Sequence, residues 1–380
     1  MRASIALGVT GFSLIAVTYG MARFSWGLMM PAIVKDIPFS PGLSGVIAAC
    51  SYVAYCLSTA GASPLVTRFG PRFPALISAM CAATGLLLLA CAVSPLMLAA
   101  GLFIAGLSSG LASPSLAGSV TRTVSENHQD MANTVINAGT GGGIILSVPV
   151  VLMMPGGWRA ACVIFAVLAL LCLLPVLRYL PADTQQQSVE KTRWRDVFQN
   201  QPMVRLAIIA LISGMASAAW WSFGPDILRQ HNGVDAKTTS MLWLVSGGAG
   251  IAGVLTGAIA SFISMKQVYR LSQLAMAAPL LLLAFSHSFS WWLIPAVAFC
   301  GAGYVILSGV LLVWGATSAA VSPAAGVSMA FFMLAAGQMA GSVIFGQLYA
   351  STGAALALTG FAMLSLMMMF ITAEKQAGCD

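Results

Sequence analysis

A single arginine interrupts the first long apolar stretch of this chain. Arg23 stands about ten residues before the end of that stretch, so a membrane-spanning helix would hold it near mid-membrane. Such an arginine costs about 2.5 to 3.5 kcal/mol on insertion scales and is expected to face a polar cavity or a partner. Its planar fork of donors fits a carboxylate, sulfonate or phosphate, which predicts an anion anchor. The competing interpretation is that Arg23 bonds helix carbonyls near Gly20 or Gly27, or a neighbouring polar side chain, and braces the bundle.

Aromatic and amide side chains are the candidates for the rest of the site. Tyr19 and Trp26 lie four residues before and three after Arg23, hence on its helix face. Uncharged hydrogen-bonding groups on other apolar stretches would suit a small polar anion; these are Tyr52, Tyr55, Asn133, Asn137, Tyr304 and Gln338. Packing, interface anchoring and helix-to-helix hydrogen bonding remain open alternatives for each of them.

The composition indicates which elements must position these residues. Charged residues make up 7% of the chain and apolar residues 59%, against roughly 25% charged in soluble domains. We therefore expect a polytopic, all-α membrane protein with twelve spans, since each span needs about 20 apolar residues. The expected spans are 5–34, 43–66, 73–93, 95–120, 131–154, 160–180, 203–225, 239–263, 268–286, 291–316, 325–349 and 354–372.

The chain repeats itself at about half its length. GMARFSWGLMMPAIV, beginning at Gly20, recurs as GMASAAWWSFGPDIL 194 positions later, with Ser217 in the place of Arg23 and Trp220 in that of Trp26. A second echo, from Met131 to Gly143, recurs 198 positions later. Two six-helix bundles of like orientation are expected, 1–180 and 203–380, related by an axis along the membrane normal and joined by a polar linker at 181–202.

The positive charges predict the orientation. With the amino terminus inside, all of the 17 Lys and Arg residues lie on the cytoplasmic side except Arg23, Lys35, Arg159, Arg229 and Lys237. This bias places both termini in the cytoplasm. It also accounts for the net charge of +7, so no nucleic-acid partner is expected. Cys/His clusters and paired acids at membrane depth are missing from the sequence, so we expect no metal, no cofactor and no enzymatic activity.

Several motifs make the whole chain resemble the major facilitator superfamily. The stretch SPLVTRFGPR, from Ser63 to Arg72, is similar to the family's loop between helices 2 and 3, with Arg68, Gly70 and Arg72 matching and Thr67 in place of its acid. Gly157 to Arg159 is another family-like feature. The run YG-x-x-RF, from Tyr19 to Phe24, with the following L-x-x-P resembles the YbfB/YjiJ branch.

The resemblance implies an alternating-access transporter of the bacterial inner membrane, expected to be a monomer in the lipid bilayer. The leading hypothesis is a small organic anion as substrate, bound by Arg23, with Arg68, Gly70, Arg72 and Asp226 as gating residues. The alternative is a multidrug or hydrophobic-metabolite exporter in which Arg23 is structural. No Asp or Glu is expected inside a span, because Asp36 and Asp226 are predicted at outer helix ends. Proton coupling, uniport and exchange therefore all stay open.

Overall fold

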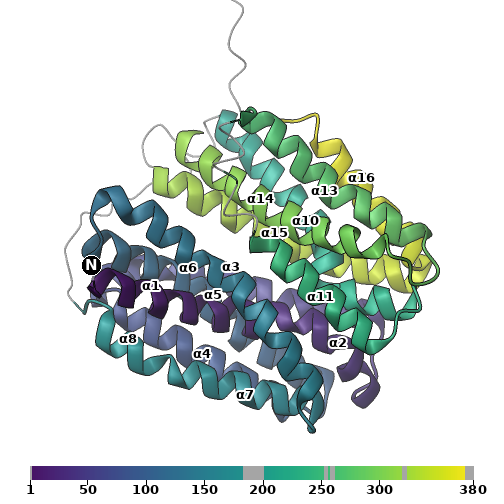
Figure 1. Ribbon diagram of the computed structural model, residues 1–380, viewed down its shortest axis with the longest axis horizontal. Coiled ribbons are helices and arrows are strands. Elements are labelled where there is room, and N and C mark those ends of the chain that lie inside the picture. Colours follow the sequence, from purple (N-terminus) through teal and green to yellow (C-terminus); the bar gives the residue numbers. More distant parts are fainter. Residues whose placement is uncertain (1, 183–200, 252–255, 257–261, 319–322, 373–380) are drawn as a thin grey trace, which may run out of the picture. The chain divides into compact units, whose positions relative to one another are not determined.

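The computed structural model describes residues 2–182, 201–251, 256, 262–318 and 323–372. These residues form helices and connecting turns, and none of them is in a β-strand. The chain divides into two compact units, Met1–Val189 (unit 1) and Glu190–Asp380 (unit 2), coloured from purple to teal and from teal to yellow in Figure 1. Nearly all of the predicted linker, 181–202, lies outside the described residues.

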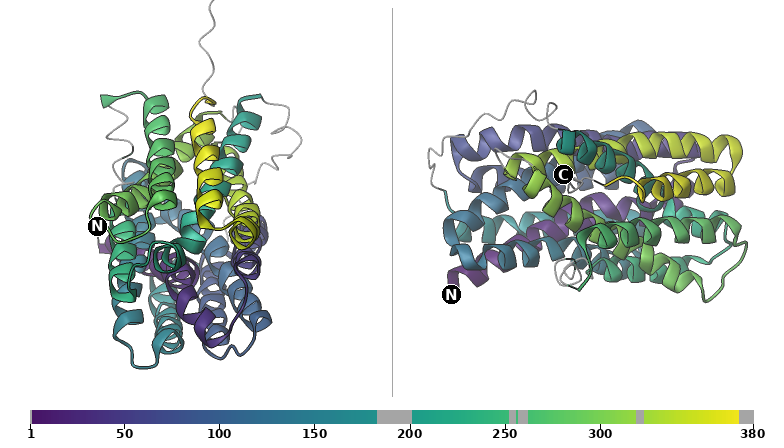
Figure 2. Two further views of the ribbon diagram at one scale, coloured as in Figure 1. Left: turned by 90° about the vertical axis from the view of Figure 1, so that its right-hand side faces the viewer. Right: turned by 90° about the horizontal axis from the view of Figure 1, so that it is seen from above.

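Within each unit the helices run side by side (Figure 2). Unit 1 contains α1 (Arg2–Ile15), η1 (Ala16–Phe24), α2 (Ser25–Asp36), α3 (Pro41–Phe69), α4 (Arg72–Ala90), α5 (Pro95–Thr123), α6 (Glu126–Met153), α7 (Gly157–Leu171) and α8 (Leu173–Tyr179). The described helices of unit 2 are α10 (Gln201–Gln230), α11 (Ala236–Gly250), α13 (Met265–Phe285), α14 (Leu293–Ser318), α15 (Pro323–Thr352) and α16 (Ala354–Met368).

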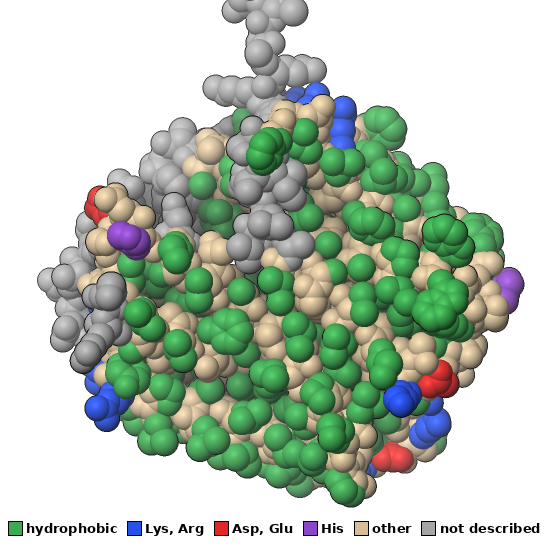
Figure 3. Space-filling view, viewed as in Figure 1, with side chains coloured by type: hydrophobic (Ala, Val, Ile, Leu, Met, Phe, Trp, Pro, Cys, Tyr) green, Lys and Arg blue, Asp and Glu red, His purple; other side chains and the backbone are tan. Residues whose placement is uncertain are grey.

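Ten helical stretches in the described residues are long and apolar enough to cross a membrane. They match ten of the twelve predicted spans. The predicted span 354–372 corresponds to the shorter helix α16, and 239–263 begins in α11 and continues into residues outside the described part. Apolar side chains also cover much of the face seen in Figure 3, as expected for a surface that meets lipid. The chain is thus an all-helical, multi-pass membrane protein.

Capping residues explain where many helices begin and end. Ser40 and Ser94 accept hydrogen bonds from the backbone N–H groups of Leu43 and Met97, each just before a proline that opens the helix. Gly70, at a φ of 74°, ends α3 in a conformation that favours glycine.

The seventh predicted span ends too early. Residues 203–225 were expected, but α10 continues through Pro225 to Gln230. Proline removes only one N–H donor, and spanning helices tolerate this loss. Asp226 therefore lies inside a helix and is only 9% exposed, whereas it was predicted to stand at the outer end of the helix.

Glycines let pairs of helices approach closely within each unit. A Cβ added at Gly139 or Gly143 of α6 would collide with the carbonyl oxygens of Phe12 and Ala16. In unit 2, Gly337 and Gly341 of α15 meet the carbonyls of Leu211 and Met215 in the same way. Close packing through glycines thus occurs in both units, although Leu211 and Met215 stand 199 positions after Phe12 and Ala16 and not the 194 of the predicted repeat.

Two arginines hydrogen bond α4 to the span formed by α7 and α8, one at each end of α4. We call these contacts the arginine clasp. Arg72 opens α4 and donates from Nε to the carbonyl of Leu180, 2.7 Å away, just after α8. Arg159 opens α7 and donates to the carbonyls of Ala90 and Ala92, at 2.9 and 2.7 Å, where α4 ends. Both arginines therefore satisfy carbonyls that a helix end leaves without an intrahelical donor.

We expect Arg159→Ala to lower the free energy of unfolding by about 1.5 to 3 kcal/mol, because hydrogen bonds from a charged donor contribute about that much. Thermal unfolding of the purified protein in lipid measures the effect. Lys35→Ala, which removes an exposed cation, is the matched control and should change little. Equal melting temperatures for the two variants would show that the clasp contributes nothing.

Candidate functional site

The helix that carries Arg23 is wound differently from a regular α-helix. Residues Ala16–Phe24 form a π-helical segment, η1, between α1 and α2. Tyr19, Gly20 and Arg23 all lie in it. Segments of π-helix are rare and are frequent at functional sites, because the wider turn displaces side chains from the α-helical spacing. Nothing in the apolar pattern of this stretch distinguishes a π-helix from an α-helix, so the sequence did not predict it.

Four aromatic rings surround the guanidinium of Arg23. Its Cζ atom lies 4.5 Å from the ring centre of Tyr55 and 4.7 Å from that of Tyr52, both on α3. Phe24 and Tyr19, on η1, are at 5.4 and 5.8 Å. Arg23 is 6% exposed. We call Arg23 with these four rings the arginine cage. Cation–π contacts contribute about 0.5 to 2 kcal/mol each, so the cage compensates part of the cost of burying the charge.

The cage is held by further contacts within unit 1. The Tyr19 hydroxyl and Ser113 Oγ, on α5, are hydrogen bonded at 2.7 Å. The rings of Tyr19 and Tyr55 meet edge to face with centres 6.2 Å apart. Three helical elements thus fix the position of the arginine. The structure brings together Arg23, Tyr19, Tyr52 and Tyr55 of the predicted site, and adds Phe24 and Ser113, which sequence reasoning missed.

Two other predicted site residues of unit 1 have different surroundings. Trp26 is 3% exposed, and its indole Nε1 has no hydrogen-bond partner among the described residues. Asn137 is exposed, and its side chain donates to the carbonyl of Asn133 on its own helix, α6, at 2.9 Å. Trp26 and Asn137 therefore lie outside the arginine cage as defined above.

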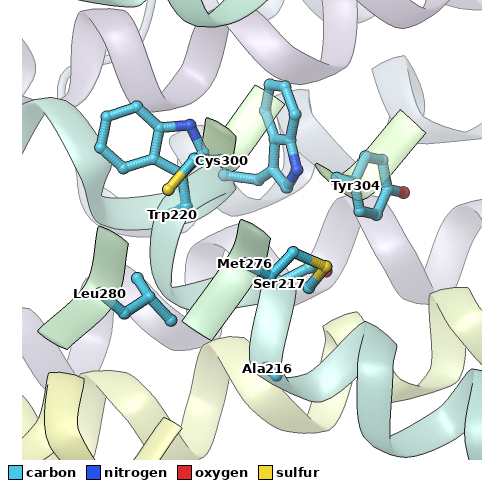
Figure 4. Close-up of a pocket in the computed structure, with 8 residues that line it drawn as sticks. Ala216, Ser217, Trp220, Met276, Leu280, Cys300 and Tyr304 are labelled. Atoms are coloured by element: carbon cyan, nitrogen blue, oxygen red, sulfur yellow. The ribbon is translucent and has the colours of Figure 1, made fainter. Parts of the chain in front are cut away.

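A small pocket in unit 2 is lined by aromatic and sulfur-containing side chains. We call it the tryptophan pocket, and its lining residues are Ala216, Ser217, Trp220, Trp221, Met276, Leu280, Cys300 and Tyr304. Figure 4 shows these side chains converging from α10, α13 and α14. None of the eight residues carries a charge. The volume is about 10 Å³, which is room for roughly one water molecule.

Hydrogen bonds fix the polar edge of this pocket. Gln338, on α15 and 1% exposed, donates from Nε2 to the hydroxyl oxygens of Tyr304 and Ser217, at 3.1 and 3.3 Å. In the predicted sequence repeat, Ser217 stands in the place of Arg23. This edge of the pocket in unit 2 holds neutral polar groups.

A tryptophan behind the pocket supports the aromatic wall. Trp243, on α11 and fully buried, lies with its ring centre 5.6 Å from those of Trp220 and Trp221. Trp220 also donates from Nε1 to Ser246 Oγ at 2.9 Å. Trp220, Tyr304 and Gln338 were predicted site residues and lie together here. Trp243, Met276 and Cys300 were missed, since buried aromatic and sulfur side chains in apolar helices carry no distinguishing pattern.

The predicted gating residues make separate local contacts. Arg68 is exposed, and its guanidinium lies 5.2 Å from the ring centre of the adjacent Phe69. Gly70 provides the left-handed end of α3, and Arg72 belongs to the clasp with Leu180. Asp226 lies in unit 2, inside α10, and is buried. Gating by these residues stays a prediction.

Two bundles of apolar helices define a polytopic membrane protein. The family model of the Major Facilitator Superfamily matches residues 12–345. The chain belongs to the Major Facilitator Superfamily.

The chain is also similar to individual proteins of known name. A chloramphenicol efflux pump of Mycobacterium tuberculosis is 26% identical over 349 residues, covering 84% of this chain and 80% of that protein. The solved nucleoside transporter NupG aligns with a TM-score of 0.77 at 16% identity, covering 97% of this chain and 98% of NupG. A POT family transporter in complex with 5-aminolevulinic acid aligns with a TM-score of 0.80 at 13% identity, covering 97% and 94%. At these identities the two structures establish the shared fold alone.

Proposed function

We propose that this protein is a secondary transporter that exports small aromatic molecules of low charge and binds them in the tryptophan pocket. The observation that carries the proposal is the lining of that pocket, in which Trp220, Trp221 and Tyr304 present ring faces and edges and none of the eight side chains is charged. Rings of this kind favour aromatic ligands by offset or edge-to-face contact.

The polar edge of the pocket supports recognition of one polar group on such a ligand. Gln338, Ser217 and Tyr304 form a hydrogen-bonded cluster beside the aromatic wall. Apolar sites with a few placed polar groups are the usual form of small-molecule sites. A pocket of about 10 Å³ does not admit such a ligand as it stands, so Trp220 or Trp221 must move aside on binding.

The relative in Mycobacterium tuberculosis supports export as the direction, because it is named a chloramphenicol efflux pump. We place the protein in a bacterial inner membrane. The distribution of Lys and Arg supports an orientation with both termini on the cytoplasmic side. Alternating access between the two membrane faces, by a monomer, is the mechanism we propose, and the YbfB/YjiJ branch remains our assignment within the family.

The arginine cage supports a second candidate, transport of a small organic anion. Arginine keeps its charge at any pH that a protein experiences, so the cage puts a permanent cation among the helices of unit 1. A carboxylate that displaced one ring would meet a bidentate donor. We rank this candidate second because the four rings already occupy the surroundings of the guanidinium.

Accumulation of labelled chloramphenicol in cells tests the choice. We expect native protein to lower accumulation several-fold relative to cells without it, and Gln338→Leu to reverse most of this effect, because leucine keeps the volume and removes both donors. Trp291→Ala, in an exposed loop position, is the control and should behave as native. The proposal fails if native protein leaves accumulation unchanged. If small carboxylates compete with chloramphenicol in native protein and this competition is lost in Arg23→Ala, the second candidate is favoured.

A further inference from the structure

An open groove in unit 2 lies on the face of α13 that points away from the tryptophan pocket. Met276 and Leu280 of this helix line the pocket and are buried, whereas Ala278 and Leu282 line the groove and are exposed. The end of α13, the start of α14 and the turn between them form the groove, and the two helices pack side by side (Figure 1). Its volume is about 520 Å³, within the usual range of about 300 to 1,000 Å³ for ligand sites.

The groove is continuous with a stripe of exposed apolar side chains along α13. A spacing of three or four residues places the members of this stripe on one face of the helix; they are Leu271, Leu274, Ala278, Leu282 and Phe285. The helix α13 is long and apolar enough to cross a membrane. Exposed apolar side chains on such a helix meet the acyl chains of the bilayer. The groove therefore opens directly to lipid.

The lining of the groove becomes polar where α13 ends. Ser286 and Ser290 line this end, and the exposed His287 lies between them in the sequence. Trp291 and Trp292, which follow Ser290, are 77% and 73% exposed. Exposed tryptophans are typical of the boundary between hydrocarbon and lipid headgroups, so this end of the groove lies at headgroup depth. An apolar wall that leads to hydroxyl groups at that depth matches a molecule with an acyl chain and a polar head.

The charges around this polar end favour a phosphate group. The sequence contains no Asp or Glu from 236 to 373. Asp235, the acid just before that range, accepts hydrogen bonds from the N–H groups of Lys237 and Thr238 at the start of α11. The carbonyl of Ser290 accepts from the N–H of Leu293 at 2.9 Å, so α14 begins at the groove, and the N–H groups of a first helical turn favour an anion. A phosphodiester placed here meets hydrogen-bond donors and no carboxylate of the turn 286–292.

The loop after α10 fixes the shape of the groove. Asn232, fully buried, donates from Nδ2 to the carbonyls of Leu283 and Ser286, at 3.0 and 2.6 Å. His231 donates from Nε2 to the carbonyl of Ala284 at 3.0 Å. These bonds occupy carbonyls that the end of α13 leaves without an intrahelical donor. The turn that carries Ser286 is therefore held in place independently of any ligand.

We propose that this groove binds one phospholipid, with an acyl chain along Ala278 and Leu282 and the phosphodiester at Ser286 and Ser290. In the orientation proposed above, α13 ends on the outer side, so the phospholipid belongs to the outer leaflet. Binding is non-covalent. It does not depend on the proposed substrate, because the groove and the tryptophan pocket lie on different faces of α13.

Native mass spectrometry of the full-length protein, titrated with dioleoylphosphatidylglycerol, tests the site. We expect native protein to bind a first molecule of this lipid more tightly than those that follow. Ala278→Phe, which fills the groove from an exposed position, should weaken the first binding at least fivefold. Ala100→Phe makes the same change at an exposed position of α5 in unit 1 and should leave the first binding unchanged. Equal first affinities in native protein and Ala278→Phe would overturn the proposal.

The position of the headgroup is tested by Ser290→Asp, whose carboxylate would repel the phosphodiester. The first affinity should fall at least fivefold in this variant, whereas Ser351→Asp, at an exposed serine near the end of α15, should keep the native value. The same affinity in both variants would refute the headgroup position. Displacement of the first lipid by chloramphenicol would assign the groove to substrate, and a dimer that Ala278→Phe dissociates would assign it to a second copy of the chain. Either result would contradict a phospholipid site.

Discussion

Gly337→Val is expected to be among the most destabilising single substitutions in unit 2. A Cβ at this position of α15 would overlap the carbonyl oxygen of Leu211 and lie 2.9 Å from the backbone nitrogen of Met215. Both obstacles are backbone atoms of α10, so no side-chain rotation relieves them and the helices must separate. Overpacking of this kind costs about 1 to 3 kcal/mol even where the neighbours are side chains, and we expect at least the upper end.

Thermal unfolding of the protein in lipid measures this cost. Gly360→Val, at a helical glycine of α16 with no atom within 4 Å of the added Cβ, is the matched control because it makes the same chemical change in open space. We expect a melting temperature several degrees lower for Gly337→Val than for Gly360→Val. Similar values would mean that α10 and α15 are not held in this contact.

Trp220→Ala is expected to lower both stability and transport. Trp220 is 2% exposed, stacks near Trp243 and donates to Ser246 Oγ. Truncating a buried tryptophan costs about 3 to 5 kcal/mol, because the transfer free energy is lost and a cavity remains. Chloramphenicol export should fall together with stability, since the same ring forms a wall of the pocket.

Trp220→Phe separates the two effects. Phenylalanine restores an aromatic wall but cannot donate to Ser246, so we expect most of the stability to return, with a loss of about 1 kcal/mol for the hydrogen bond. Trp292→Ala, at a tryptophan that is 73% exposed, serves as the control for truncation. If Trp220→Ala unfolds at the same temperature as Trp292→Ala, the ring does not pack as described.

The helical class of the fold followed from composition. A chain with so few charged residues does not form a soluble domain, and its long apolar stretches indicate membrane-spanning helices. The predicted span 43–66 lies within α3, which extends a few residues further at each end to its caps, Ser40 and Gly70. The predicted span 203–225 stops at Pro225, short of the end of α10. In a spanning helix the lost N–H bond is tolerated, and the helix continues to Gln230.

The arginine cage was partly predictable. A buried cation demands partners, and Tyr19, Tyr52 and Tyr55 were the aromatic hydroxyl residues on helices expected to lie nearby. The π-helical turn and Phe24 were not predictable, since they depend on a local winding that side-chain pattern does not encode. The hydrogen bond between Ser222 and Ser342 was missed for a related reason: serines in apolar helices carry no partner information until the register of two helices is known.

Ligand-dependent thermal stabilisation of purified protein tests the central claim most directly, using chloramphenicol and small carboxylates on native protein, Gln338→Leu and Arg23→Ala. A ligand at about 100 times its dissociation constant adds roughly 2.7 kcal/mol if it binds only the folded state. The account predicts stabilisation by chloramphenicol that Gln338→Leu weakens and Arg23→Ala preserves. Stabilisation by carboxylates alone, lost in Arg23→Ala and kept in Gln338→Leu, would contradict it and assign the protein to organic anions.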